Sequence, residues 1–227
     1  MPSTMASLVT DPNSFFRDRR DAPSFIGPVL IVTAIAVLGV GSAIISIRAT
    51  SEMMGQIMAD SGAGQGAQTI FQAFQLVGVV LGFLWTYVVW VLWTAIFYAI
   101  TAIFDGSGGF TTTLKLVGWG FVPSLVGSAI NLLINVYRFE IRGFDVPATA
   151  DPQAAQEFAQ QMSSGPLVAL SAVLGIVFTL WGGLLWTFAV KHGRQVTTRN
   201  AAIAVALPVV LGLGASLWGL LGAFNVL

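Results

Sequence analysis

Five stretches of the chain contain no Asp, Glu, Lys or Arg and are dominated by apolar residues. Each is long enough to supply the roughly 20 helical residues that cross a bilayer. The runs are continuous, whereas the strands of a membrane barrel would alternate apolar and polar positions over about 10 residues. The pattern therefore predicts an all-α integral membrane protein with five transmembrane helices, at about residues 25–47, 70–104, 116–137, 166–190 and 201–227.

The composition agrees with a membrane protein and excludes several kinds of chemistry. Hydrophobic residues make up 56% of the chain and charged residues 9%, against roughly 25% charged residues in soluble domains. Ten basic residues balance ten acidic ones, so we expect no nucleic-acid partner. The chain has no Cys and one His, His192, which excludes thiolate chemistry and multi-His metal sites. We therefore expect no metal ion and no cofactor.

The basic residues are divided unevenly between the predicted loops, and this division predicts the orientation. Seven lie before the first span and in the second and fourth loops: Arg17, Arg19, Arg20, Lys115, Lys191, Arg194 and Arg199. The other three basic residues are Arg48, Arg138 and Arg142. They lie on the opposite side, together with six acidic residues. We expect the amino terminus inside and the carboxyl terminus outside, with residues 1–24 as a cytoplasmic segment and 25–227 as the membrane domain.

Three polar segments have the pattern of short helices. Asp11 followed by Pro12 is a helix-start signal. Phe15 and Phe16 beside the arginines suit a helix in the headgroup region, or simply the positive anchor of the first span. Segments 51–58 and 153–162 are interpreted as amphipathic helices on the outer surface. The Gly-rich segment 105–111 lacks the Lys-Ser or Lys-Thr of a phosphate loop, so we expect a tight turn there.

The spans contain no ionisable residue, and such residues commonly mark intramembrane active sites and proton pathways. A serine nucleophile would need a nearby base, and His192 lies in a loop. We therefore expect no enzymatic activity and no catalytic residue.

The neutral polar residues of the spans allow two interpretations. Asn131 and Asn135 lie four residues apart and share a helix face, and Gln72 and Gln75 open the second span. Buried amides commonly join neighbouring helices. The asparagine pair is therefore either an interhelical contact or the lining of a polar path, with the two glutamines at its entrance.

The inner basic residues form a second candidate site. Together they would make a cationic surface that contacts anionic lipid or a partner, although orientation alone also accounts for them. The residues concerned are Arg17, Arg19, Arg20, Lys191, Arg194 and Arg199. Small residues at four-residue spacing, such as Gly78 and Gly82, favour close helix packing, either within one bundle or in a homo-oligomer.

The order of these features resembles the Yip family, the Ypt/Rab-interacting membrane proteins defined by the Yip-one domain. The matching pieces are Asp11-Pro12 with Phe15-Phe16, Gly27-Pro28, Gly108-Gly109-Phe110, the segment 115–123, and the basic turn 191–199 before the last span. The resemblance implies five spans, a cytosolic amino terminus and no known catalytic site. Eukaryotic members are linked to Rab GTPases through a longer amino-terminal region. Here about 24 residues precede the first span, and this short segment argues against small-GTPase binding. In this respect the chain resembles a bacterial or archaeal member, which would lie in the cytoplasmic membrane.

Two functions follow from these observations. The absence of catalytic residues, the small-residue faces and the resemblance favour a non-enzymatic scaffold or adaptor that organises membrane lipids, further copies of itself or another membrane protein. The alternative is a facilitative transporter or lipid-moving protein with a polar path near Asn131 and Asn135.

Overall fold

The computed structural model describes residues 5–60, 62, 65–143 and 152–224. Within these residues every regular element is helical: α1 (Ser7–Thr10), α2 (Pro12–Arg19), α3 (Ile26–Asp60), α4 (Gln65–Ala102), α5 (Phe110–Trp119), α6 (Val122–Val136), the π-helical η1 (Tyr137–Arg142), α7 (Pro152–Ser163), α8 (Pro166–Arg194) and α9 (Thr198–Ala223). Five segments are long and apolar enough to cross a membrane: Ile26–Arg48, Gly66–Ala102, Phe110–Arg142, Pro166–Arg194 and Thr198–Ala223. The predicted number of membrane-spanning segments is confirmed, and residues 225–227 of the last predicted span lie outside the described residues.

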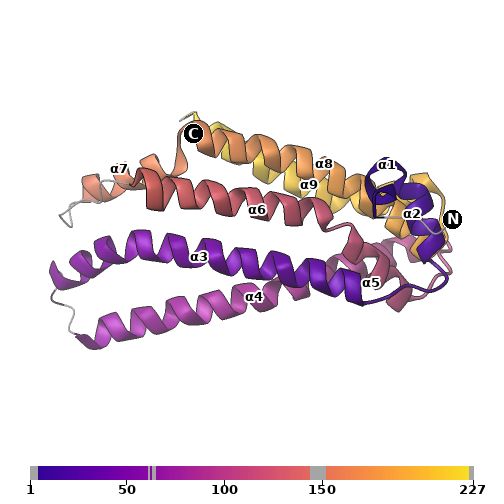
Figure 1. Ribbon diagram of the computed structural model, residues 1–227, viewed down its shortest axis with the longest axis horizontal. Helices are drawn as coiled ribbons and strands as arrows, with labels where there is room; N and C mark the ends of the chain where they lie inside the picture. The colour runs from indigo at the N-terminus through magenta and orange to yellow at the C-terminus, as the bar shows by residue number, and fades with distance from the viewer. Residues whose placement is uncertain (1–4, 61, 63–64, 144–151, 225–227) are drawn as a thin grey trace.

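α3 and α4 pack together as a long hairpin (Figure 1). The first span was expected to end near residue 47, and its apolar segment does end at Arg48. Residues 51–58 were expected to form a separate surface helix, but α3 instead runs without a break to Asp60. Residues 48–60 contain no Pro and one Gly, Gly55. A helix tolerates a single Gly at a cost of about 1 kcal/mol. Nothing therefore interrupts the backbone hydrogen bonds before the Gly-rich stretch that follows.

The third span consists of two helices rather than one. α5 ends at Trp119, and Gly120 and Phe121 separate it from α6. Pro123 has no N–H to donate, and in an unbroken helix its ring would collide with the carbonyl of Trp119. Gly120 N instead donates to Val117 O at 2.9 Å and closes α5 with a tighter turn. The sequence predicted one span over 116–137, and the structure divides it so that Pro123 lies in the first turn of α6.

α8 and α9 are fixed to each other at both ends. Gly165, with φ +103°, turns the chain from α7 into α8, and its N–H donates to Ala223 O at 3.1 Å. At the other end Gln195 adopts a left-handed conformation that terminates α8, and Thr197 Oγ1 accepts the N–H of Asn200 at 3.2 Å to begin α9. The amphipathic helix predicted at 153–162 is confirmed as α7, in which Phe158 is buried.

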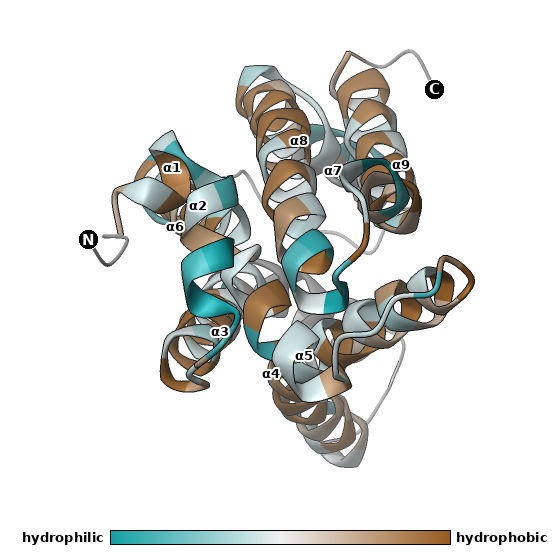
Figure 2. Cartoon of the chain, turned by 90° about the vertical axis from the view of Figure 1, so that its right-hand side faces the viewer, coloured by the Kyte–Doolittle hydropathy of each residue, from teal (hydrophilic) through white to brown (hydrophobic). Residues whose placement is uncertain are grey.

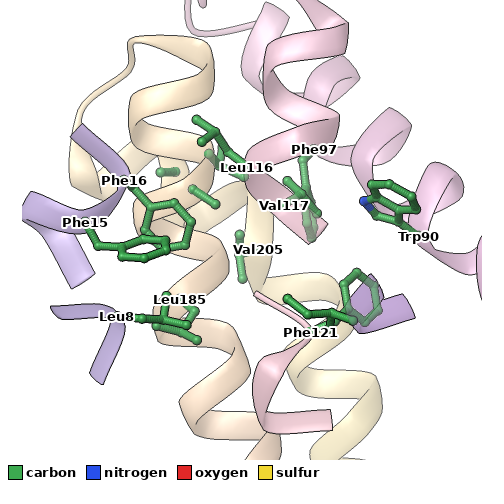
Figure 3. Close-up of a cluster of buried hydrophobic side chains, with 14 of the residues drawn as sticks. Leu8, Phe15, Phe16, Trp90, Phe97, Leu116, Val117, Phe121, Leu185 and Val205 are labelled. Atoms are coloured by element: carbon green, nitrogen blue, oxygen red, sulfur yellow. The ribbon is translucent and has the colours of Figure 1, made fainter. Parts of the chain in front are cut away.

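The buried core lies at one end of the molecule, where α1, α2 and α5 meet the ends of α4 and α8 (Figures 1 and 3). We call this the amino-terminal end. Its fully buried side chains include Phe15, Phe16, Phe97, Leu116 and Leu185. Towards α7, α3 stays beside α6 and contacts η1, whereas α4 lies on the outer side of α3, away from α6 (Figure 1). The amino-terminal end is therefore the well-packed part of the protein.

The long helices expose most of their apolar surface. In the second candidate span, which lies on α4, only 6% of the residues in the most apolar window are buried inside the protein. In water, an apolar surface of this size would cause association or aggregation. In a bilayer, lipid tails are as apolar as Leu side chains, so the same surface can stay in contact with lipid. The low burial is thus what a membrane protein requires.

Candidate functional site

The six basic residues predicted to contact lipid or a partner all lie at the amino-terminal end. Figure 2 looks onto this end, where hydrophilic residues gather in front of mainly hydrophobic helices. The six differ in exposure: Arg17, Arg20 and Arg199 are exposed, Arg19 and Lys191 are half-buried, and Arg194 is buried. They therefore do not form one uniform cationic surface.

α2 is held on the bundle by aromatic and polar contacts. Phe15 and Phe16 are fully buried, and the Phe15 ring meets Trp119 edge-on with centroids 5.3 Å apart. Asn13 Oδ1 accepts a hydrogen bond from Lys191 Nζ at 3.0 Å and lies 2.9 Å from His192 Nε2. One of the two interpretations of this segment placed the phenylalanines in the headgroup region, but both lie in the protein core. α5 and α8 offer these rings an apolar site, where burial contributes about 1.5–3 kcal/mol per side chain.

Arg19 contributes to the same attachment. Its guanidinium carbon lies 3.7 Å from the centroid of the Phe15 ring and 5.7 Å from that of Trp119. Partial burial lowers the pKa of Arg19, but a guanidinium stays charged at any physiological pH. The contact with Phe15 lies within α2, and the cation–π contact with Trp119 is the one that joins α2 to α5.

Arg194 departs most clearly from the expected surface role. Its side chain is 2% exposed, and Nε donates to Thr101 Oγ1 at 3.0 Å. Nη1 and Nη2 donate to the carbonyls of Gly108 and Gly106, and the guanidinium lies 3.9 Å from the centroid of the Tyr98 ring. Arg194 thus holds the Gly-rich turn between α4 and α5, and its side chain is not accessible to lipid or a partner.

What the amino-terminal end exposes is a surface of mixed charge. Arg17 pairs with Asp18 at 3.5 Å, and Arg20 pairs with Asp21 at 3.2 Å. Such exposed pairs add little stability, but each carboxylate offsets the charge of its neighbour. We call these four residues, together with Arg199, the polar end surface.

A pocket of about 500 Å³ lies between α4, α6, α8 and α9 in the membrane-spanning part of the molecule. Small residues and neutral polar groups form much of its lining, including Ser124, Ser128, Asn131, Thr179 and Trp186. Trp186 Nε1 is buried without a hydrogen-bond partner among the described residues. Asn131 is exposed, and within the part of the chain that the structure describes its amide forms no hydrogen bond. We call this space the intramembrane pocket.

The four amides of the predicted polar path do not lie in one place. Asn131 lines the intramembrane pocket, whereas Gln75 lines a separate pocket of about 360 Å³ between α3 and α4. Gln72 is exposed on α4, and Asn135 is half-buried and lines neither pocket. Of the four amides, Asn131 is therefore the one that lines the intramembrane pocket.

Several residues of these sites carry no signal in the sequence. Asn13, Tyr98 and Thr101 become important through contacts across the chain, to Lys191 and Arg194. The same holds for Thr179 and Trp186, which meet α6 in the pocket. Among the described residues, no three His, Cys, Asp or Glu side chains are placed to hold a metal ion.

Residues 6–219, nearly the whole chain, match the model of the Yip1 domain. The chain belongs to the Yip1 family. An uncharacterised protein of Methanocaldococcus jannaschii is 28% identical over 138 residues, which cover 60% of this chain and 92% of that relative. No solved structure matches the chain. With five segments that are long and apolar enough to cross a membrane, this Yip1-family protein is a multi-pass membrane protein, and the resemblance read from its motifs is confirmed.

Proposed function

We propose that this Yip1-family protein is a non-enzymatic scaffold or adaptor in a prokaryotic cytoplasmic membrane, with its amino-terminal end facing the cytoplasm. The observation that carries the proposal is the fixed position of α2, whose Phe15 and Phe16 are fully buried. Because α2 is docked, the polar end surface has one defined shape. A preformed surface loses less conformational entropy when a partner binds.

The charges of this surface favour a protein partner over bulk anionic lipid. A purely cationic surface gains about 1 kcal/mol per basic residue near an anionic membrane. Here Asp18 and Asp21 lie beside Arg17 and Arg20 and would be repelled by the same lipid. Alternating charges instead select a partner with the complementary arrangement.

Site-specific photocrosslinking in native membranes tests this role. A photoreactive residue at Thr198, which is exposed beside Arg199, is expected to give a discrete protein adduct. The same residue at Leu217, exposed on α9, is the matched lipid-facing control. The adduct should be lost in the variant R17Q/R20Q/R199Q and kept in R48Q. If the photoreactive residue at position 198 gives the same adducts as the one at position 217, the adaptor role is wrong.

The second candidate is a transporter or lipid-moving protein, which the intramembrane pocket and Asn131 favour. Towards the amino-terminal end, however, Trp93 and Trp186 of the pocket both pack against Phe97, with centroids 6.3 and 5.8 Å apart. These rings would have to move for a solute to pass. Liposomes that contain the protein should therefore exchange fluorescent lipid between leaflets no faster than empty liposomes. Faster exchange that Asn131→Leu abolishes would establish the transport role instead.

A further inference from the structure

A second polar cavity lies at the opposite end of the molecule, near the end of the third span and the start of the fourth. Its volume is about 550 Å³, and it is lined by Arg138 and Arg142 of η1, Gln161 of α7 and the connection between α7 and α8. We call it the η1 cavity. We propose that the η1 cavity binds the phosphate of a membrane lipid headgroup.

Positive charge is concentrated in the η1 cavity rather than spread over this end. The loops on this side contain three basic residues and six acidic ones. Two of the three, Arg138 and Arg142, line the cavity, and the third, Arg48, is exposed on α3 outside its lining. Among the described residues, no carboxylate lines the cavity: Glu140 and Glu157 are exposed and outside the lining, and residues 145 and 151 are not described.

The donors of the cavity match a phosphate group. Arg142 is exposed, and its planar guanidinium can donate two parallel hydrogen bonds to phosphate oxygens. Arg138 is half-buried and adds a second positive charge to the same lining. Gln161 and Ser164 add a neutral amide and a hydroxyl to the same lining. The first turn of α8 also borders the cavity, and its N-cap Gly165 supplies no side-chain cap. This helix start adds a weaker attraction for an anion.

The position of the cavity favours a lipid over free phosphate. Arg142 ends the third candidate span and Pro166 begins the fourth, so the cavity lies where a span meets the headgroup layer. Leu167 is part of its lining, and further along α8 the exposed side chains Leu170, Val173 and Val177 are spaced three and four residues apart. This spacing makes one apolar face of α8. A lipid bound by its phosphate would find this face available for its acyl chains.

Lipid retention measured by native mass spectrometry tests the proposal on the intact protein. The protein is released from nanodiscs of mixed phosphatidylglycerol and phosphatidylcholine, as wild type, as R138Q/R142Q and as R48Q. We expect wild type and R48Q to retain phosphatidylglycerol preferentially, and R138Q/R142Q to retain about tenfold less, as expected when a charged hydrogen-bond pair is lost. R138K/R142K keeps the charge without the planar donors, and we expect intermediate retention.

Three results would overturn the proposal. The first is equal loss of lipid in R48Q and R138Q/R142Q, since that would reflect net charge alone. The second is unchanged retention in R138Q/R142Q when its helical circular dichroism matches wild type. The third is binding of inorganic phosphate by the protein in detergent, when neither wild type nor any variant retains lipid. That result would show that the ligand is a free anion. If R138Q/R142Q fails to fold, the comparison of R138K/R142K with R48Q decides.

Discussion

Arg194 Nε donates a hydrogen bond to Thr101 Oγ1 at 3.0 Å, although 93 residues separate the two along the chain. The Thr101 hydroxyl itself donates to Phe97 O at 2.6 Å. Through the carbonyls of Gly106 and Gly108 the same guanidinium also holds the turn between α4 and α5. The end of α8, the end of α4 and the Gly-rich turn therefore form one unit around a single buried cation.

Removing that cation should destabilise the protein strongly. We expect Arg194→Met to lower the free energy of unfolding by about 3–5 kcal/mol, because buried acceptors lose a charged partner. Arg194→Lys should lose most of the same energy, since one ammonium cannot reproduce the planar donors. Denaturant unfolding in micelles, followed by circular dichroism, measures the change. Arg199→Met, at an exposed position, should change little, and equal losses in both variants would contradict the assignment.

The approach of the Gly-rich turn to α8 gives a second prediction. A Cβ on Gly108 would collide with the backbone carbonyl of Gly193, whereas nothing lies within 4 Å of a Cβ on the adjacent Gly109. We expect Gly108→Ala to cost about 1–3 kcal/mol or more, because backbone must shift. Gly109→Ala should cost less than about 1 kcal/mol, mainly through its N-cap position. The ratio of the two losses in the same unfolding assay is the test, and equal losses would show that the turn does not touch α8.

The start of α2 should depend on pH. Asp11 Oδ1 accepts the N–H of Ser14 at 3.1 Å, and hydrogen bonds from Ser14 hold the pKa of Asp11 below its ordinary value. The cap therefore stabilises α2 above the unfolded pKa, about 4, and its contribution is lost as the pH falls through the lower folded value. The amide proton shift of Ser14, followed by NMR, should titrate below about pH 4. Asn at position 11 can cap the helix but cannot ionise. If the Ser14 amide shift still titrates in Asp11→Asn, another group causes the pH dependence.

The apolar runs were enough to predict the five spans because the membrane imposes the requirement locally, residue by residue. The limits of the helices needed different information. Hydropathy marks where α3 leaves the apolar layer but not where the helix ends, since residues 48–60 include charged and polar side chains and are still helical. The break at Gly120 follows from Pro123, so that local residue could have predicted two helices in the third span.

The candidate sites were less predictable, because they depend on contacts between distant segments. Arg194 and Arg199 have the same chemistry five residues apart, yet one is buried and the other is exposed. The difference arises from Thr101 and the carbonyls of the Gly-rich turn, about 90 residues earlier in the chain. Helical spacing likewise placed Asn131 and Asn135 on one face, but which of them borders a pocket depends on how α8 and α9 pack.

Asn131 allows a test of the two interpretations of the intramembrane amides. Asn131 is exposed and forms no hydrogen bond among the described residues, so Asn131→Leu replaces a polar group in hydrocarbon by an apolar one. We expect the stability of the monomer in micelles to stay the same or to rise by up to about 1 kcal/mol. An interhelical contact would be worth about 0.6–2 kcal/mol, and a loss of that size would restore the interpretation of Asn131 as a contact between helices.

Thr33 supplies the matched control for this measurement. Its hydroxyl lies 2.7 Å from Tyr87 Oη and joins α3 to α4, which is the kind of contact that Asn131 lacks. Thr33→Val should therefore lose about 0.6–2 kcal/mol under the same conditions. If Thr33→Val loses stability and Asn131→Leu does not, the amide of Asn131 is free to serve the intramembrane pocket, because the fold does not depend on it.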